Sequence, residues 1–136
     1  MEIRTKKQKI TNPKEIASIL RDILMSEDQI DQDKEHFWVI GLNSRNVIQY
    51  VELVSLGTLD ASLVHPREVF RLAIFKGVSH IIVGHNHPSG DTEPSLEDIS
   101  MTRRLEDAGR IIGIEVVDHI IISGEGFVSF KEKNLI

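Results

Sequence analysis

The hydrophobic positions of this chain repeat with two periods, one typical of helices and one typical of strands. Apolar spacings of three and four residues predict three helices, which begin after Asn12, at Pro66 and at Ser95, and the third is expected to end at Gly109. Asparagine and serine are residue types that cap helices, and proline is favoured in the first turn. The predicted core-facing positions are Ile16, Ile19, Leu20, Ile23 and Leu24 in the first helix, Val69, Phe70, Ala73 and Ile74 in the second, and Asp98, Met101, Leu105 and Ala108 in the third.

Runs of β-branched and aromatic residues predict five strands. Residues 36–42 and 47–53 are separated by a four-residue turn and predict a hairpin, which Gly57-Thr58 should end. Residues 78–83 are continuously apolar, as in a strand covered on both faces. Two further strands are predicted at residues 114–122 and 127–130, with a turn at 124–126 between them. The remaining connections, residues 26–34 and 84–94, are predicted loops, and residues 1–11 an extended or loose arm. This order predicts a single α/β domain over residues 1–136, with a sheet flanked by helices.

Composition and charge exclude several function classes. The 136 residues contain no cysteine, which removes disulfides, thiolate metal ligands and cysteine nucleophiles. The net charge is −5, and the basic cluster Arg4, Lys6, Lys7 and Lys9 in the arm is interpreted as a solvated tail, so charge argues against DNA as the main partner. The N-terminus does not resemble a signal peptide, and the apolar runs are too short to span a bilayer. We therefore expect a cytoplasmic protein with no membrane partner.

Two histidines and an aspartate have the spacing of a metal site. His85 and His87 follow the apolar run and point to the same side of an extended chain. After seven intervening residues Ser95 follows as a helix cap, which places Asp98 in the first turn, on the core-facing stripe. A carboxylate among apolar neighbours is costly unless a charge compensates it, and neutral imidazole is a preferred zinc ligand. Each residue has a structural alternative, namely a cap, a first-turn acid or a histidine bonded to backbone. All four residues of the pattern (His85, His87, Ser95 and Asp98) occur together at this spacing, and that coincidence favours the metal site.

The pattern H-x-H-x7-S-x2-D resembles the motif of the JAMM metalloproteases. Three more phrases, Gly57-Thr58-Leu59, residues 65–70 and residues 118–121, resemble the bacterial RadC family, whose members carry an MPN (JAB) domain. The resemblance runs from about Asn12 to Ile136. It implies an MPN, cytidine-deaminase-like α/β fold with a mixed sheet flanked by helices, and one Zn²⁺ ion.

The resemblance also implies a role for each site residue. His85, His87 and Asp98 would be the zinc ligands, and a zinc-bound water would attack a peptide or isopeptide amide bond of a peptide or protein substrate. A glutamate at the head of a core strand would take the proton from that water, and Glu35 has this position. Glu52 is the competing candidate, although an acid in the middle of a hairpin strand commonly points to solvent. Ser95 would donate a hydrogen bond to the developing oxyanion.

The resemblance leaves alternatives open. Asn86 stands where peptidase members usually have Ser or Thr, and longer RadC proteins carry an N-terminal helix-hairpin-helix region that this sequence lacks, so it fits a short form or a domain of a longer protein. A metal-bearing binding module in nucleic-acid transactions, without hydrolysis, is the alternative function; a zinc deaminase would require cysteines. Asp118-His119 is either a pair that orients a metal ligand or a polar pair at a strand bend. Trp38 is predicted to be core, His65 a helix cap, and His36 and His80 structural or exposed. The sequence does not indicate an oligomeric state.

Overall fold

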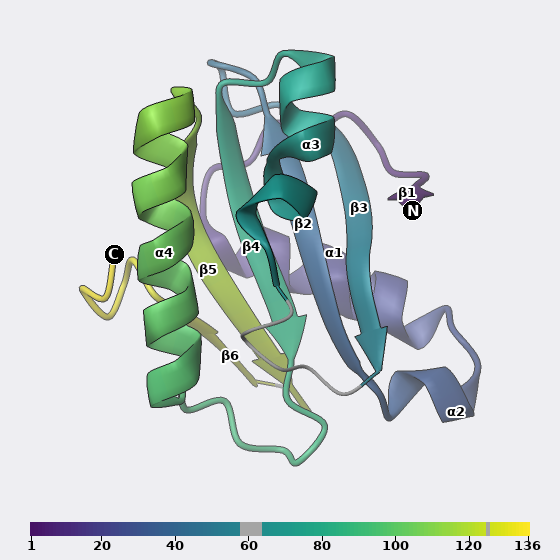
Figure 1. Ribbon diagram of the computed structural model, residues 1–136. Coiled ribbons are helices and arrows are strands. Elements are labelled where there is room, and N and C mark those ends of the chain that lie inside the picture. The colour runs from purple at the N-terminus through teal and green to yellow at the C-terminus, as the bar shows by residue number, and fades with distance from the viewer. Residues whose placement is uncertain (58–63, 125) are drawn as a thin grey trace.

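The strands of the computed structural model form one mixed sheet in the order β1-β3-β2-β4-β5-β6 (Figure 1). The structure describes residues 1–57, 64–124 and 126–136. Within them the strands are β1 (Glu2–Ile3), β2 (Glu35–Leu42), β3 (Ile48–Gly57), β4 (His80–Asn86), β5 (Glu115–Ser123) and β6 (Gly126–Ser129), and the helices are α1 (Pro13–Met25), α2 (Gln29–Gln32), α3 (Pro66–Lys76) and α4 (Leu96–Ile112). Thr58 and Leu59, which contribute to the family resemblance, and Glu125 of the expected turn lie outside the described residues. The predicted α/β class, with a mixed sheet flanked by helices, is confirmed.

One face of the sheet packs against α1. The predicted N-cap is confirmed, since the side chain of Asn12 accepts a hydrogen bond from the backbone N–H of Glu15. The helix buries Ile16, Leu20 and Leu24 against alternate residues of β2 that include Trp38. The expected amphipathic first helix and the core position of Trp38 are therefore confirmed, and burial of these apolar side chains is what attaches the helix to the sheet.

The opposite face packs against α3 and α4, which lie side by side in Figure 1. Phe37, Val39 and Val83 point to this side, where they contact Phe70 of α3 and Leu105 of α4. The strand β4 is thus covered on both faces, as its continuous apolar run predicted. Because β4 and β5 are parallel, both run toward the end of the sheet at which α4 begins.

Two predicted boundaries and one predicted core position need correction. The predicted loop at residues 26–34 contains the short helix α2, which Asp28 caps by accepting from the backbone N–H of Asp31. The strand β4 continues to Asn86, so the loop begins at His87 rather than at residue 84. Ile74, predicted to face the core, is 57% exposed, because it lies beyond the buried stripe of α3.

The third helix does not end at Gly109. It continues to Ile112 and ends at Gly113, whose φ of 86° is the left-handed conformation that favours glycine. Gly109 is buried inside the helix, and a Cβ there would meet the carbonyl oxygen of Ile114. This glycine therefore serves a close approach between α4 and Ile114, the residue before β5, and is not a C-terminal cap.

The N-terminal arm is extended and contributes to the sheet. Glu2 and Ile3 pair with Glu52 and Val51 of β3, and Lys9 forms an isolated bridge with Val47. Among the described residues no helix combines the length and the apolar character that crossing a bilayer requires. The cytoplasmic location expected from the sequence stays a prediction.

Candidate metal centre

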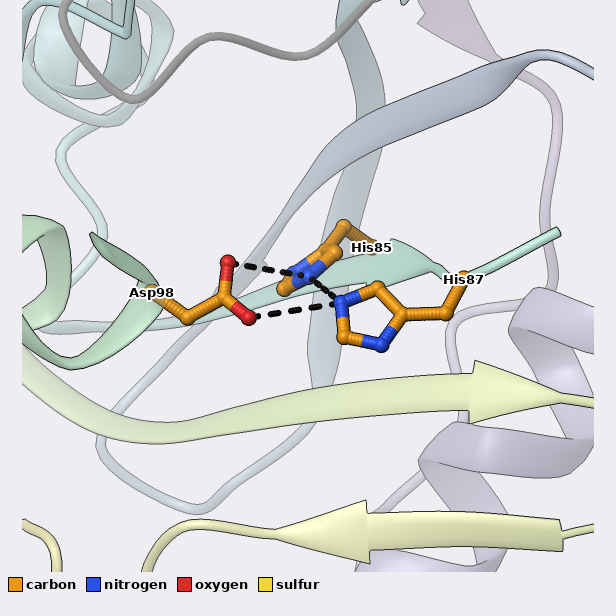
Figure 2. Close-up of side chains that lie close together, drawn as sticks. All are labelled: His85, His87 and Asp98. Carbon is orange, nitrogen blue, oxygen red and sulfur yellow. Dashed lines mark hydrogen bonds and ion pairs between the residues drawn. The ribbon is translucent and has the colours of Figure 1, made fainter. Parts of the chain in front are cut away.

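Three side chains, from β4, from the connection that follows it and from α4, meet at one end of the sheet (Figure 2). His85 lies near the end of β4, His87 follows that strand by one residue, and Asp98 lies in the first turn of α4. Alternation along the extended chain turns both imidazoles to the same side, as the sequence predicted. One ligand atom from each residue lies within 4.8 Å of the others, so the group can hold a metal ion.

The ring nitrogens and the carboxylate oxygens converge closely. The two Nε2 atoms of His85 and His87 are 2.8 Å apart. The carboxylate of Asp98 spans both rings, with Oδ1 3.4 Å from Nε2 of His85 and Oδ2 3.3 Å from Nε2 of His87. His85 is fully buried and Asp98 is 7% exposed, so water screens these charges little.

The three groups shift one another's pKa values. Burial raises the pKa of Asp98, but its hydrogen bonds with His85 and His87 outweigh burial and hold that pKa well below its ordinary value. The hydrogen bond with Asp98 raises the pKa of His87, whereas burial lowers the pKa of the fully enclosed His85. Asp98 is therefore a carboxylate at neutral pH, the form in which it can bind a cation.

A contact with the backbone orients the ring of His87. Its Nδ1 lies 2.7 Å from the backbone carbonyl oxygen of Asp91, which can only accept a hydrogen bond, so Nδ1 carries the proton. In the neutral ring Nε2 then presents a lone pair toward His85 and Asp98. Lone pairs and a carboxylate that converge in this way need a positive charge between them, either a proton or a metal ion, and two imidazole nitrogens with one carboxylate oxygen form a donor set that suits zinc. The residues present therefore fit the metal that the sequence predicted.

Ser95 joins this site as the cap of α4. Its Oγ accepts from the backbone N–H of Asp98 at 3.0 Å, and Oδ2 of Asp98 accepts from the backbone N–H of Ser95 at 2.9 Å. This reciprocal capping box confirms the predicted cap and fixes the carboxylate of Asp98. The bond from Asp98 uses a lone pair of the Ser95 hydroxyl and leaves its proton available to another acceptor.

The two candidate general bases lie in different surroundings. Glu35, at the head of β2, lines a cavity of about 680 Å³ together with His85, His87, Ser95 and Asp98. Glu52 is 4% exposed and lies beside α3, where Nη2 of Arg71 is 3.7 Å from its Oε2. The expectation that Glu52 points to solvent is wrong, because the side chain turns toward α3 and gains a cationic neighbour. The structure brings Glu35 to the candidate metal ligands and places Glu52 in a separate ion-pair cluster.

Comparison with known families agrees with this geometry. Residues 10–135 match the RadC-like JAB domain, which is nearly the whole chain. The chain belongs to the RadC-like JAB domain family. Similar proteins, each named UPF0758 protein, occur in Desulforamulus reducens (52% identity over 83% of this chain and 50% of the relative) and in Moorella thermoacetica (47% identity over 93% of this chain and 53% of the relative). A third, from Geobacillus kaustophilus, is 51% identical over 81% of this chain and 49% of its own length. The chain thus spans about half the length of the curated relatives it matches.

Asn86, the residue between the two histidines of this RadC-like domain, has a structural role. Its Oδ1 accepts from the backbone N–H of His36 at 2.6 Å, and its Nδ2 donates to the backbone carbonyl of Lys34 at 2.9 Å. One amide thereby holds the backbone on both sides of Glu35. The departure from the Ser or Thr of peptidase members consequently supplies both a donor and an acceptor that link β4 to the start of β2.

The pair Asp118-His119 of the RadC-like domain divides into two roles. Asp118 accepts from Oγ of Ser129 at 2.6 Å and from the backbone N–H of Lys131 at 2.9 Å, so it fastens the chain after β6. His119 instead lies with its Nε2 2.6 Å from Nδ1 of His85. The interpretation as a pair behind a metal ligand therefore fits His119, whereas Asp118 has a structural role.

Sequence reasoning missed Thr102. Its Oγ1 lies 2.6 Å from Nδ1 of His119 and 2.7 Å from the backbone carbonyl of Asp98. It stands four residues after Asp98, so helical spacing placed it on the same face as that candidate ligand. The other histidines lie outside this group. His36 is buried and bonded to Glu27, and His80 is partly buried beside Glu115. His65 occupies the N-cap position of α3 without a side-chain capping bond.

Proposed function

We propose that this RadC-like domain is a zinc-dependent hydrolase of the JAMM type that cleaves a peptide or isopeptide amide bond. The observation that carries the proposal is that the candidate ligands and two reactive side chains line one cavity. The three candidate ligands His85, His87 and Asp98 line the same cavity as a carboxylate, Glu35, and a hydroxyl, Ser95. An amide-hydrolysing site needs a proton acceptor and an oxyanion donor beside a Lewis acid, and these residues supply both groups.

The number of ligands supports a catalytic rather than a structural metal. Structural zinc sites have four protein ligands, whereas catalytic sites have three and leave one position open. His85, His87 and Asp98 are the three donors that the described residues bring together. A zinc ion held there would polarise the scissile carbonyl and lower the pKa of water to about 7.

The chain's own groups perform the proton transfers. Glu35 accepts a proton from the attacking water and returns it to the leaving amine, which departs as a neutral group. The hydroxyl of Ser95 donates to the oxygen that becomes negative during attack. Asp98 holds the backbone of Ser95 through the capping box, so the candidate donor and one candidate ligand are fixed together.

The direct test is hydrolysis in water enriched in ¹⁸O. Zinc-loaded protein is incubated with a peptide library and with lysine-linked isopeptides, and the products are analysed by mass spectrometry. We expect new carboxyl ends that contain ¹⁸O, and none with Glu35→Gln protein that retains its zinc. Intact substrates of every class with zinc-loaded protein would contradict the proposal.

The alternative function, a metal-bearing module in nucleic-acid transactions, makes a different prediction. Such a module would bind DNA or RNA with an affinity that falls steeply as salt rises, and would release no ¹⁸O-labelled product. The chain covers about half the length of its relatives. Any partner that a whole protein of this family binds is therefore also a matter of proposal. Salt-dependent binding without hydrolysis would replace the hydrolase proposal by this one.

A further inference from the structure

A buried series of hydrogen bonds connects two of the candidate ligands, His85 and Asp98, through residues that do not line the cavity. It runs from Nδ1 of His85 to Nε2 of His119 (2.6 Å), from Nδ1 of His119 to Oγ1 of Thr102 (2.6 Å), and from Oγ1 to the backbone carbonyl of Asp98 (2.7 Å). His85 and His119 are fully buried and Thr102 is 1% exposed. The hydrogen-bonding partners within this series, rather than water, therefore determine which atoms carry the protons.

The last acceptor, the backbone carbonyl of Asp98, determines the donor-to-acceptor direction of every hydrogen bond in the series. A backbone carbonyl can only accept, so the short contact between Thr102 and Asp98 requires the hydroxyl proton of Thr102. The Oγ1 atom then accepts from Nδ1–H of His119. A neutral His119 has its second nitrogen unprotonated, so its Nε2 accepts from Nδ1–H of His85. The Nε2 of His85 is left with a lone pair that points at His87 and Asp98.

The opposite direction is unfavourable for two reasons. If Thr102 donated to His119, its Oγ1 and the Asp98 carbonyl oxygen would face each other at 2.7 Å without a proton between them. His119 would then donate from Nε2 to Nδ1 of His85, and the proton of His85 would move to Nε2. A protonated Nε2 cannot bind a metal.

The ring of His119 is held in this arrangement by its neighbours. Phe130 stacks on it with ring centroids 4.3 Å apart and an interplanar angle of 20°, and Phe37 meets it edge-on at 6.2 Å. Neither phenylalanine offers a hydrogen-bonding group that could replace His85 or Thr102. The ring therefore keeps Nε2 directed at His85 and Nδ1 directed at Thr102.

We propose that Thr102 and His119 are positioning residues that hold His85 with its proton on Nδ1 and its Nε2 free to bind the metal. His87 receives the same orientation directly from the Asp91 carbonyl, whereas His85 depends on this two-residue relay. The proposal rests on the proposed function only in taking His85 as a ligand. Since supports of this kind typically change metal affinity by about 10- to 100-fold, loss of the relay should weaken zinc binding by that factor.

The test compares Thr102→Val with Thr102→Ser. Valine is β-branched like threonine and removes only the hydroxyl, whereas serine keeps it. Zinc affinity is measured by competition with a chromophoric chelator. The position of the proton on His85 is read from long-range ¹H–¹⁵N correlation spectra of the metal-free chain. We expect Thr102→Val to bind zinc about 10- to 100-fold more weakly and to shift proton population from Nδ1 to Nε2. Thr102→Ser should restore both values.

Unchanged affinity and an unchanged proton position in Thr102→Val would overturn the proposal. Equal loss of affinity in the valine and serine variants, with His85 still protonated at Nδ1, would also overturn it, because packing and not the hydroxyl would then be responsible. The spectra need neither metal nor substrate. A chain that binds no zinc would therefore refute the proposed function, while the proton position would still decide between the relay and its absence.

Discussion

Asn86, at the end of β4, accepts a hydrogen bond from the backbone N–H of His36, at the start of β2, at a distance of 2.6 Å. The same side chain donates to the carbonyl of Lys34 at 2.9 Å, so the backbone on both sides of Glu35 is fastened to the strand that carries the two histidines. A residue between two candidate ligands thus positions the candidate general base. This relationship links the candidate metal site and the candidate general base through one side chain.

Replacement of Asn86 should loosen this link. Asn86→Ala leaves the buried N–H of His36 without its acceptor, which costs roughly 1–3 kcal/mol of stability in urea unfolding. Hydrolysis should fall as Glu35 moves, while zinc stays bound because no ligand is changed. Asn86→Asp is the matched variant. It keeps the acceptor for His36 but turns a carboxylate oxygen toward the carbonyl of Lys34, so it should not restore stability. Wild-type stability and activity in Asn86→Ala would show that the clamp has no role.

Ser95 is predicted to act both as a cap and as an oxyanion donor. Ser95→Ala removes both functions and should cost about 1 kcal/mol of stability. Glycine is tolerated as a cap at a cost of only a few tenths of a kcal/mol, so Ser95→Gly separates the two roles. We expect Ser95→Gly to melt near the wild type and to turn over roughly 10²–10³-fold more slowly. A wild-type rate in this variant would leave Ser95 with the capping role alone.

The assignment of the general base is tested by two glutamate variants. Glu35→Gln should retain zinc and lose at least about 10²-fold in rate, because an amide cannot accept the proton. Glu52→Gln should hydrolyse substrate at the wild-type rate, since Glu52 lies beside Arg71 and away from the candidate ligands. Bound zinc is measured in both proteins together with the rate. The reverse pattern, with an active Glu35→Gln and an inactive Glu52→Gln, would show that the base is Glu52.

Gly109 should tolerate no side chain although it lies in a helix. Alanine normally stabilises a helix by roughly 0.5–1 kcal/mol relative to glycine. At this position a Cβ would meet the carbonyl oxygen of Ile114, so we expect Gly109→Ala to destabilise the fold by about 1–3 kcal/mol instead. Ser100→Ala, at an exposed position of the same helix, is the control and should be neutral or slightly stabilising. Stabilisation in Gly109→Ala would mean that α4 does not approach Ile114 as described.

The predictable parts of the fold were those with a strong local pattern. The continuous apolar run of β4 required cover on both faces, and α1 on one side and α3 with α4 on the other provide it. The spacing from His87 to Ser95 and Asp98 lies within one connection, so a strand end and a helix start were enough to bring the candidate ligands together. The strand β1, with two residues, has too short a pattern to be predicted.

The unpredicted parts depend on how distant elements fit together. The contact between His119 and His85 depends on the register of β5 against β4, which shifts by one residue between Ile81 and Ile82. No local pattern encodes that irregularity, and the pairing of His119 with Thr102 follows from it. Gly109 was mistaken for a helix end because glycine favours both caps and close approaches. Only the position of β5 distinguishes the two.

The metal content of the purified protein tests the central claim most directly. Protein isolated without chelator is analysed for metals, beside His87→Ala and Asp98→Ala, and all three are melted with and without added chelator. We expect about one zinc per wild-type chain, little in either variant, and a lower melting temperature for the wild type after chelation. A metal that binds only the folded chain adds about 4 kcal/mol when its free concentration is about 1,000 times its dissociation constant. A metal-free wild type that melts at the same temperature as both variants would contradict the account.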